Sequence, residues 1–306
     1  MLTRPVTGVI AAPFLPMHAD GAIDWGATER YIDWVAGQRP VGIAMNMDAS
    51  EVIALTEAEQ DEVIARCKAV IGGRTALLSG VVAGSTRAAA AKAERYARAG
   101  VDGLAVFPPF PTFSGAPVPG DMIYRFHKAI GDASRLPLVC FQFPKGWGPD
   151  YTPDILRQMA EIPEIVAIKE ASFDVAQTLS TIEVAAALPR PIGVLTGSDT
   201  FIFEAMTMGC RGALIGFAGS FTRELIAMNA GVQSGDFAAA RAIWAQIGPI
   251  ARACWQPPIR DFRPRMKEVL RLQGLIPCAA CREPQLGIPG TERDALAALM
   301  RRQGLL

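Results

Sequence analysis

The chain has little of what marks several common classes of protein. Its two histidines, His18 and His127, lie far apart and lack the HExxH spacing of zinc enzymes, so we expect no metal site. The 30 basic and 30 acidic residues balance and are interspersed, so we expect no nucleic acid or anionic membrane as a partner. The longest apolar runs have the length of strands and are too short to cross a bilayer.

The N-terminus and the cysteines favour a cytoplasmic location. Residues 1–5 lack the basic region and apolar stretch of a secretory signal. The six cysteines are scattered without a disulfide framework, which makes the cytoplasm the default expectation. Cys278 and Cys281 form a CxxC, but no second pair completes a zinc site, and prolines flank the motif. We interpret it as a plain loop, with a functional dithiol as the alternative.

Strand-like runs and helical segments alternate along most of the chain. Eight short apolar runs are typical of buried parallel strands, at residues 7–12, 41–45, 76–82, 103–107, 138–141, 165–169, 192–196 and 212–215. Helical periodicity lies between them, at residues 25–37, 57–71, 87–99, 121–133, 153–161 and 176–187. Thr56, Thr152 and either Ser85 or Thr86 have N-cap chemistry. Eight strand–helix units over about 220 residues predict an α/β fold, the (β/α)8 TIM barrel.

The ends of this pattern define the expected domains. From about residue 235 onward only helical periodicity remains, at residues 237–254, 262–273 and 292–303. We therefore expect a barrel over residues 1–222 and appended C-terminal helices over residues 223–306 that pack on it. A doubly wound nucleotide-binding sheet is disfavoured, because the first run ends in Ala11-Ala12-Pro13-Phe14 rather than in a Gly-rich phosphate loop.

Lys169 is the most informative single residue. Four apolar residues lead directly into it. Lysine is seldom buried without a use, and burial favours the neutral amine, a nucleophile that condenses with ketones and aldehydes to a Schiff base. Strand alternation points Lys169 and Ala167 toward the barrel axis and Glu170 away from it. A lysine at a strand end that reaches solvent is the alternative.

Four stretches of the chain fit one known pattern. They are residues 8–13 followed by 21–24, Ser50-Glu51 followed by 55–59, Ile168-Lys169-Glu170, and Gly197-Ser198-Asp199 with Gly209, Gly212 and Ala213. Together they resemble the dihydrodipicolinate synthase and N-acetylneuraminate lyase family of class I aldolases, over the whole chain. The resemblance implies that Lys169 is the Schiff-base lysine of a lyase without a cofactor. It also implies a homo-oligomer, a dimer or a tetramer.

The chain departs from that family where the family handles its substrate. Two small hydroxyl residues usually hold the substrate carboxylate after the second strand, but here Asp48-Ala49 stands there, and an ionised aspartate would repel a carboxylate. Phe141 replaces the usual relay tyrosine and cannot shuttle a proton. The loop after the fourth strand, Phe107-Pro108-Pro109-Phe110-Pro111, also lacks a tyrosine. These changes argue against dihydrodipicolinate synthesis and against sialic acid lysis.

We therefore expect two catalytic residues, Lys169 and Asp48, with Asp48 as the acid–base group that replaces the tyrosine. A solvated turn aspartate is the alternative for Asp48. Lys145 fits the loop rim as a surface lysine. The expected substrate contacts are Ala49, Phe141 as an aromatic wall, Gln142, Gly197 and Leu214.

The expected activity is that of an aldolase or dehydratase acting on a small 2-oxo acid or related carbonyl compound. Two alternatives remain open. Loss of the relay hydroxyls fits a barrel that binds a ligand without catalysis, although an unused buried amine is costly. Residues 216–220, a stretch with two glycines after the eighth strand, weakly fit a phosphate site.

Overall fold

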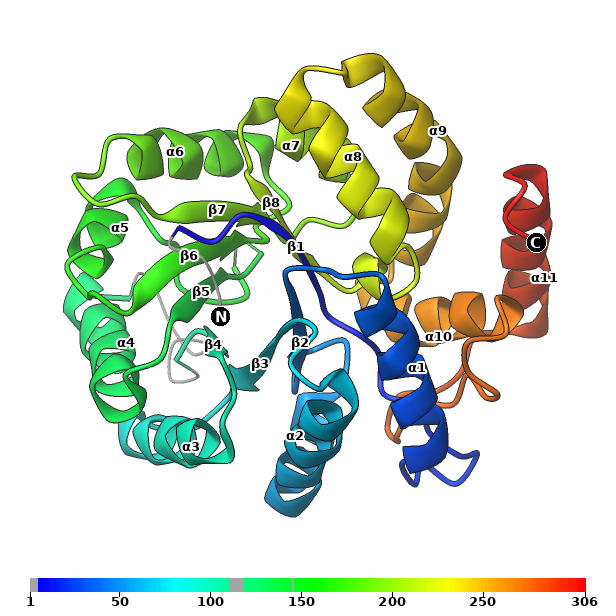
Figure 1. The fold of residues 1–306 in the computed structure, drawn as a ribbon, viewed down its shortest axis with the longest axis horizontal. Coiled ribbons are helices and arrows are strands. Elements are labelled where there is room, and N and C mark those ends of the chain that lie inside the picture. Colours follow the sequence, from blue (N-terminus) through cyan, green and yellow to red (C-terminus); the bar gives the residue numbers. More distant parts are fainter. Residues whose placement is uncertain (1–4, 110–117, 145) are drawn as a thin grey trace.

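Eight parallel strands close into a barrel at the centre of the molecule (Figure 1). The computed structural model describes residues 5–109, 118–144 and 146–306. The strands are β1 (Gly8–Ala11), β2 (Gly42–Met45), β3 (Ala76–Val81), β4 (Gly103–Val106), β5 (Leu138–Gln142), β6 (Ile165–Glu170), β7 (Gly193–Thr196) and β8 (Gly212–Ile215). They pair in the order of the sequence, and β8 pairs with β1 to close the ring. The predicted (β/α)8 barrel with appended helices is confirmed.

A ring of helices surrounds the strands (Figure 1). In chain order these are α1 (Trp25–Gly37), α2 (Glu57–Ile71), α3 (Thr86–Ala99), α4 (Gly120–Ser134), α5 (Pro153–Met159), α6 (Val175–Ala186), α7 (Ile202–Met208) and α8 (Thr222–Ser234). The limits predicted for α1 and α2 agree with the structure. α7 and α8 were not among the predicted segments; α7 has only seven residues, and neither helix has a side-chain N-cap hydrogen bond.

The N-caps read from the sequence are confirmed, and they fix where the loops at the carboxyl ends of the strands stop. Thr56 Oγ1 accepts from the Glu59 backbone N–H (3.2 Å), while the Glu59 carboxylate accepts from the Thr56 N–H (2.8 Å), which is a capping box. Ser85 caps α3 and Thr152 caps α5, with Pro153 at the first helical turn.

Burial of the strands explains why they read as apolar runs. Apart from Gly8, every residue of the eight strands is buried. Helices cover a parallel barrel on the outside and layered side chains fill its inside, so neither face of a strand meets water. Within these strands Lys169 and Glu170 are the charged residues. A charge in such a place needs a specific explanation.

The described C-terminal segment contains α9 (Phe237–Cys254), α10 (Phe262–Leu272) and α11 (Gly290–Arg302), outside the ring of helices (Figure 1). α9 packs on α8, and α10 contacts both α9 and α11. The domain boundary expected after residue 222 falls at the first residue of α8. Helix α8 contacts β1 of the barrel. We keep that boundary as a proposal. Cys278 and Cys281 lie in the loop between α10 and α11.

A buried ion pair joins the C-terminal segment to the loop after β2. Lys267 of α10 is fully buried and donates to the carboxylate of Glu51 and to the Ala280 carbonyl (2.7 Å). The same carboxylate accepts the backbone N–H of Arg282 (2.8 Å). The Arg282 guanidinium then pairs with Glu59 at the start of α2 (2.8 Å). The segment is thus anchored at two points beside the mouth of the barrel.

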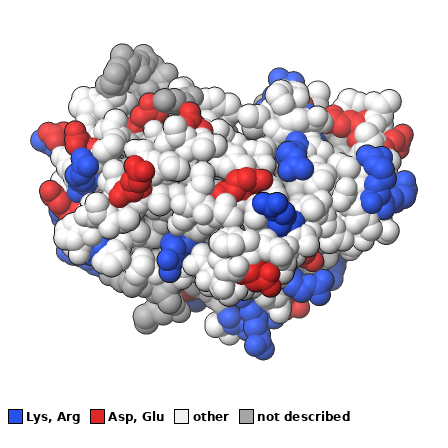
Figure 2. Space-filling view, turned by 90° about the horizontal axis from the view of Figure 1, so that it is seen from above, with Lys and Arg blue, Asp and Glu red and all other residues white. Residues whose placement is uncertain are grey.

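The surface carries both signs of charge side by side. On the face drawn in Figure 2, basic and acidic side chains are interspersed among uncharged areas, and neither sign forms a continuous patch. Among the described residues, no helix combines the length and the apolar character needed to cross a bilayer.

Replacing Lys267 by methionine tests the buried ion pair between Lys267 and Glu51. The change leaves the Glu51 carboxylate buried without its cation, so we expect the free energy of unfolding to fall by about 3–5 kcal/mol. Lys128→Met is the matched control, because it removes an exposed pair with Asp132 (2.6 Å) whose loss should have little effect. Urea denaturation followed by circular dichroism measures both, and equal losses would contradict the role given to Lys267.

Candidate active site

Lys169 lies near the carboxyl end of β6, with its side chain in the mouth of the barrel. In the sheet it is paired with Phe141 on β5 and with Leu195 on β7. Its amine Nζ lies 3.5 Å from the centre of the Phe141 ring, a cation–π contact. The next residue, Glu170, points the other way and accepts from the Thr178 hydroxyl on α6 (2.5 Å). Alternation along β6 therefore separates the two charges onto opposite faces.

Gly197 makes room for the stem of this lysine. It directly follows β7, the neighbour of β6. A Cβ atom at position 197 would lie 2.8 Å from Cε and 2.9 Å from Cγ of Lys169, and 2.7 Å from Cβ of Ala171. These separations are far shorter than ordinary contacts between carbon atoms. The path of the Lys169 side chain therefore requires glycine at position 197.

The amine of Lys169 faces a cavity of about 320 Å³ at the carboxyl ends of the strands. Both expected catalytic residues and three of the expected substrate contacts line it, namely Lys169, Asp48, Ala49, Phe141 and Gly197. A larger groove of about 810 Å³ meets it at Ile53, Arg260 and Arg263, but Lys169 does not line that groove. We place the candidate active site in the smaller cavity because it contains the buried amine.

Burial decides the protonation of the lysine. Loss of water around Lys169 lowers the pKa of its amine from 10.5 to about 8, while the carboxylates of Asp199 and Asp48 act in the opposite direction. Among the described residues, no hydrogen bond or ion pair engages Nζ; its contact is the Phe141 ring. The cavity thus holds an amine that is easily deprotonated and free to react.

Asp199 is the carboxyl group whose charge acts most strongly on that amine. It is buried, lines the cavity, and accepts the backbone N–H of Phe217 at Oδ1 (3.0 Å). Burial raises the pKa of Asp199 from 3.8 to about 7, while the Phe217 N–H and the Lys169 charge lower it. This carboxyl group is therefore able to hold a proton near neutral pH.

Asp48 lies at the rim of the cavity rather than deep in it. Its side chain is 44% exposed and forms an ion pair with Arg263 of α10. The Arg263 guanidinium also donates to the Asp48 carbonyl (2.7 Å) and is itself largely buried. A residue of the C-terminal segment thereby fixes both the backbone and the carboxylate of Asp48.

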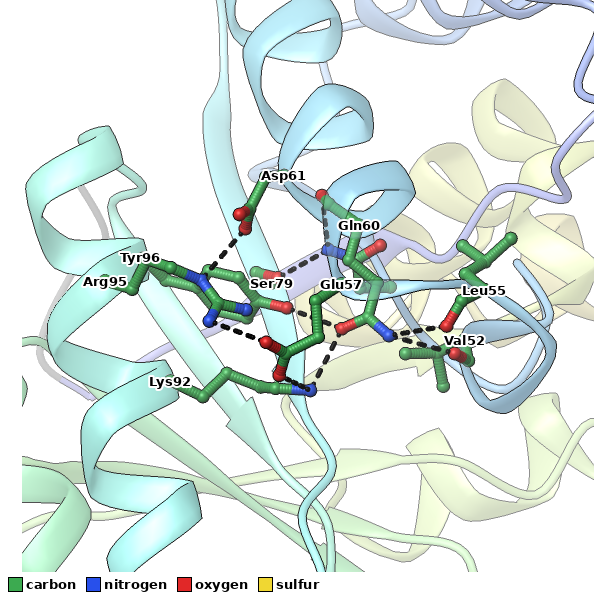
Figure 3. A network of polar contacts seen from close by, with 10 residues as sticks. Val52, Leu55, Glu57, Gln60, Asp61, Ser79, Lys92, Arg95 and Tyr96 are labelled. Carbon is green, nitrogen blue, oxygen red and sulfur yellow. Dashed lines mark hydrogen bonds and ion pairs between the residues drawn. The ribbon is translucent and has the colours of Figure 1, made fainter.

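The loop after β2, which carries Asp48, is held from behind by the polar network of Figure 3. Gln60 stands at its centre. Its amide nitrogen donates to two carbonyls of the loop, and its oxygen accepts from two side chains of α3. The partners are the Val52 (3.2 Å) and Leu55 (3.1 Å) carbonyls, Lys92 Nζ (3.0 Å) and the Tyr96 hydroxyl (2.8 Å). This network fixes the shape of one wall of the cavity.

Two expected substrate contacts do not line the cavity. Gln142 follows Phe141 on β5 and so faces the opposite side of the strand, where its side chain donates to the Phe143 (2.8 Å) and Pro149 (3.2 Å) carbonyls and accepts the Tyr151 N–H (2.7 Å). Leu214 is fully buried within β8 and is also absent from the lining. Phe110, Pro111 and Lys145 lie outside the described residues.

Residues 216–220, weighed as a phosphate site, form a short 3-10 turn, η3 (Phe217–Gly219). The Phe217 N–H at its start is already used by Asp199. That donor is not available to an anion while the bond to Asp199 persists.

Sequence reasoning missed Asp199 and Arg263 as candidate site residues. Asp199 had a detectable signal, because it follows β7 closely and parallel strands bring their carboxyl ends to one face of the barrel. Arg263 had none, because it reaches the rim only through the packing of α10.

Comparison with curated proteins places these features in a family. The model of the "Dihydrodipicolinate synthetase family" matches residues 5–303. A 4-hydroxy-tetrahydrodipicolinate synthase from Moorella thermoacetica is 27% identical over 301 residues, which cover 97% of this chain and 98% of the relative. Another, from Methanospirillum hungatei, is 30% identical over 219 residues, 69% of this chain and 70% of the relative.

Solved structures agree with this placement. The chloride-inhibited dihydrodipicolinate synthase from Acinetobacter baumannii, complexed with pyruvate, is 26% identical and superposes with a TM-score of 0.87, over 98% of this chain and 99% of that one. A prophage protein from E. coli K12, also in complex with pyruvate, has a TM-score of 0.88 at 23% identity, with 98% and 99% coverage, and supports the fold alone. Because the family model matches nearly the whole length of this chain, the chain belongs to the dihydrodipicolinate synthetase family, whose members are lyases.

Proposed function

We propose that this protein is a lyase that forms a Schiff base between Lys169 and a small 2-oxo acid or related carbonyl compound. The observation that carries the proposal is the Lys169 amine, buried in a cavity without a hydrogen-bond partner among the described residues and with its pKa lowered by desolvation. A buried, desolvated lysine is the usual form of an amine nucleophile. A cytoplasmic homo-oligomer remains part of the proposal, on the resemblance to the family.

The chemistry follows from a neutral amine and a nearby acid. Lys169 Nζ attacks the carbonyl carbon, and a proton moves from nitrogen to oxygen to give a carbinolamine. An acid then donates a proton to the carbinolamine hydroxyl, which leaves as water while the nitrogen lone pair forms the protonated imine. In aldol cleavage, the imine accepts the electron pair of the neighbouring C–C bond as that bond breaks, and a base removes the proton of the substrate hydroxyl, which becomes a carbonyl; an enamine is left. In dehydration, a base removes the proton beside the imine to give the enamine, which then expels the hydroxyl group as water with a proton from an acid.

Two carboxyl groups divide the proton transfers in this proposal. Asp199 is buried close to Lys169 and has its pKa raised by burial, so it supplies the proton that removes water from the carbinolamine. Asp48 stands at the rim beside Arg263 and acts later, on the bond that breaks. Between them they replace the relay tyrosine, whose position Phe141 occupies.

A barrel that binds a ligand without catalysis is the competing function. It is favoured by one observation: no serine, threonine or tyrosine is among the described residues that line the cavity. It leaves the desolvated amine of Lys169 unexplained. Covalent trapping separates the two functions.

The Schiff base is tested with sodium borohydride. Incubation with 2-oxo acids of increasing size, followed by reduction, should add the mass of the reduced adduct to Lys169, as read by intact mass and peptide mapping. Lys169→Ala should abolish the adduct. Labelling of another lysine, with Lys169→Ala still active, would exclude Lys169 as the nucleophile.

The substrate preference of the family's named members is not expected here. Phe141 and Asp48-Ala49 stand where the relay tyrosine and the carboxylate-binding hydroxyls would be. Assays with pyruvate and aspartate semialdehyde should therefore give negligible turnover. A turnover number in the usual enzymatic range of about 1–1000 per second would refute this prediction.

Because Asp199 and Asp48 are assigned to different steps, replacing each of them should have a different effect. Asp199→Asn keeps an oxygen for the Phe217 N–H but cannot donate a proton, so adduct formation should slow by about 10²–10⁴-fold. The wild-type trapping rate should be highest between about pH 7 and pH 8, because Lys169 is increasingly protonated below that range and the acid form of Asp199 is lost above it. The fall above that range should be absent in Asp199→Asn.

Asp48→Asn is the matched variant at the rim. It should leave adduct formation intact and lower turnover of a trapped substrate by about 10²–10⁴-fold. Full turnover in Asp48→Asn would remove Asp48 from the mechanism. A wild-type trapping rate in Asp199→Asn would do the same for Asp199, and neither result would affect the assignment of Lys169.

A further inference from the structure

The wall of the cavity around Lys169 is dominated by aromatic side chains. Asp48, Lys169, Asp199, Arg260 and Arg263 are its charged residues, and most of the others are apolar. Six aromatic rings line it, from Phe141, Phe143, Trp147, Phe173, Trp255 and Phe262. No hydroxyl-bearing side chain is among its described residues. Side-chain partners for a chain of substrate hydroxyls are therefore limited to the charged groups, and hydroxyls that face the aromatic rings would lose water without replacement, which is unfavourable.

Four of these rings form two groups in separate parts of the fold. Phe141 and Phe143, at the end of β5 and just beyond it, pack edge to face with centroids 4.6 Å apart. Phe107 supports both from behind, at 5.0 and 5.7 Å. From the C-terminal segment, Trp255 stacks on Phe262 with centroids 5.2 Å apart and planes inclined by 24°. Their mutual contacts hold the rings in place before any ligand arrives.

Two further rings line the cavity at some cost to the fold. Trp147 is 54% exposed, although burial of so large a ring is usually favourable. Phe173 has a left-handed backbone, with φ at 57°, which is uncommon for a bulky residue. Its N–H donates to the Ser198 hydroxyl (3.2 Å), which helps to hold that conformation. Strained backbone is concentrated at sites with a function.

We propose that the substrate of this site is a 2-oxo acid that carries an aromatic ring, rather than a polyhydroxylated sugar acid. The inference rests on the proposed function in that Lys169 holds the carbonyl carbon, while the aromatic walls hold the ring. A cavity of about 320 Å³ lies at the small end of ligand sites, which suits a compound with a single ring. Edge and face contacts with the lining rings orient it.

A matched pair of ligands tests this substrate class. The rate of borohydride trapping at Lys169 is measured against the concentration of 2-oxo-4-phenylbutanoate, 2-oxobutanoate and 2-oxo-3-deoxygluconate. The phenyl compound should half-saturate the rate at a concentration at least about tenfold lower than the other two, because a good apolar fit of even one methylene is worth about 10–200-fold. Equal half-saturation, or tighter binding of the sugar acid, would overturn the inference and leave Lys169 as the nucleophile.

Binding of acids that cannot form an imine tests the aromatic substrate class separately from the Schiff-base function. Calorimetry compares 4-phenylbutanoate with butanoate, neither of which can form an imine. Preferential binding of the phenyl acid supports the aromatic cavity even if no 2-oxo acid is trapped, in which case the Schiff-base function fails alone. If no 2-oxo acid is trapped, the absence of a preference for the phenyl acid in calorimetry overturns the inference.

A pair of variants locates the effect. Phe143→Ala should shrink the preference for 2-oxo-4-phenylbutanoate over 2-oxobutanoate by about tenfold. Phe237→Ala is the control, because Phe237 is half exposed on α9 and does not line the cavity. It should leave the preference at its wild-type value. An unchanged preference in Phe143→Ala would contradict the proposal that the substrate's phenyl ring packs against Phe143.

Discussion

Desolvation of the Lys169 amine is the constraint on which the mouth of the barrel depends. The strands around it are apolar and closed, so the amine loses water and the neutral form becomes accessible near pH 8. The rest of the mouth is arranged to permit this. Gly197 leaves space for the stem, and Glu170 is turned to the other side of β6. Asp199 remains close enough to interact and is itself desolvated, so the two groups share one low-dielectric environment.

The mouth is completed by the C-terminal segment. Arg263 holds Asp48, and Lys267 neutralises the buried Glu51, so both charged residues of the loop after β2 depend on α10. From the other side, Gln60 holds the same loop against α3. A loop fixed from two directions loses little conformational entropy when a ligand binds, which favours affinity. The apolar rings that close the cavity come from the same C-terminal segment, from the end of β5 and the loop after it, and from the loop after β6.

The fold could be predicted because its pattern is long and regular: eight buried strands give eight apolar runs, and Thr56, Ser85 and Thr152 mark helix starts by local chemistry. Helix α7 was missed because it is short and has no side-chain cap. Lys169 could be found because a charge inside an apolar strand is conspicuous. Gln142 shows a limit of the same reasoning, since the alternation that turns Glu170 away from the mouth also turns Gln142 away. Arg263, Trp255 and Phe262 could not be found, because only tertiary packing brings them to β6.

The position of α10 separates two properties along the chain. The reactive amine, its space and its nearest acid lie between β6 and the residues just after β7. The rim arginine and the stacked Trp255–Phe262 pair lie much later, beyond α9. Part of the wall that contacts the ligand is therefore inherited through a different stretch of sequence from the nucleophile. Recombination or gradual drift in the late stretch could remodel what enters the mouth of the barrel while Lys169, Gly197 and Asp199 are preserved, which gives a barrel of this kind a route to new substrates without rebuilding its nucleophile.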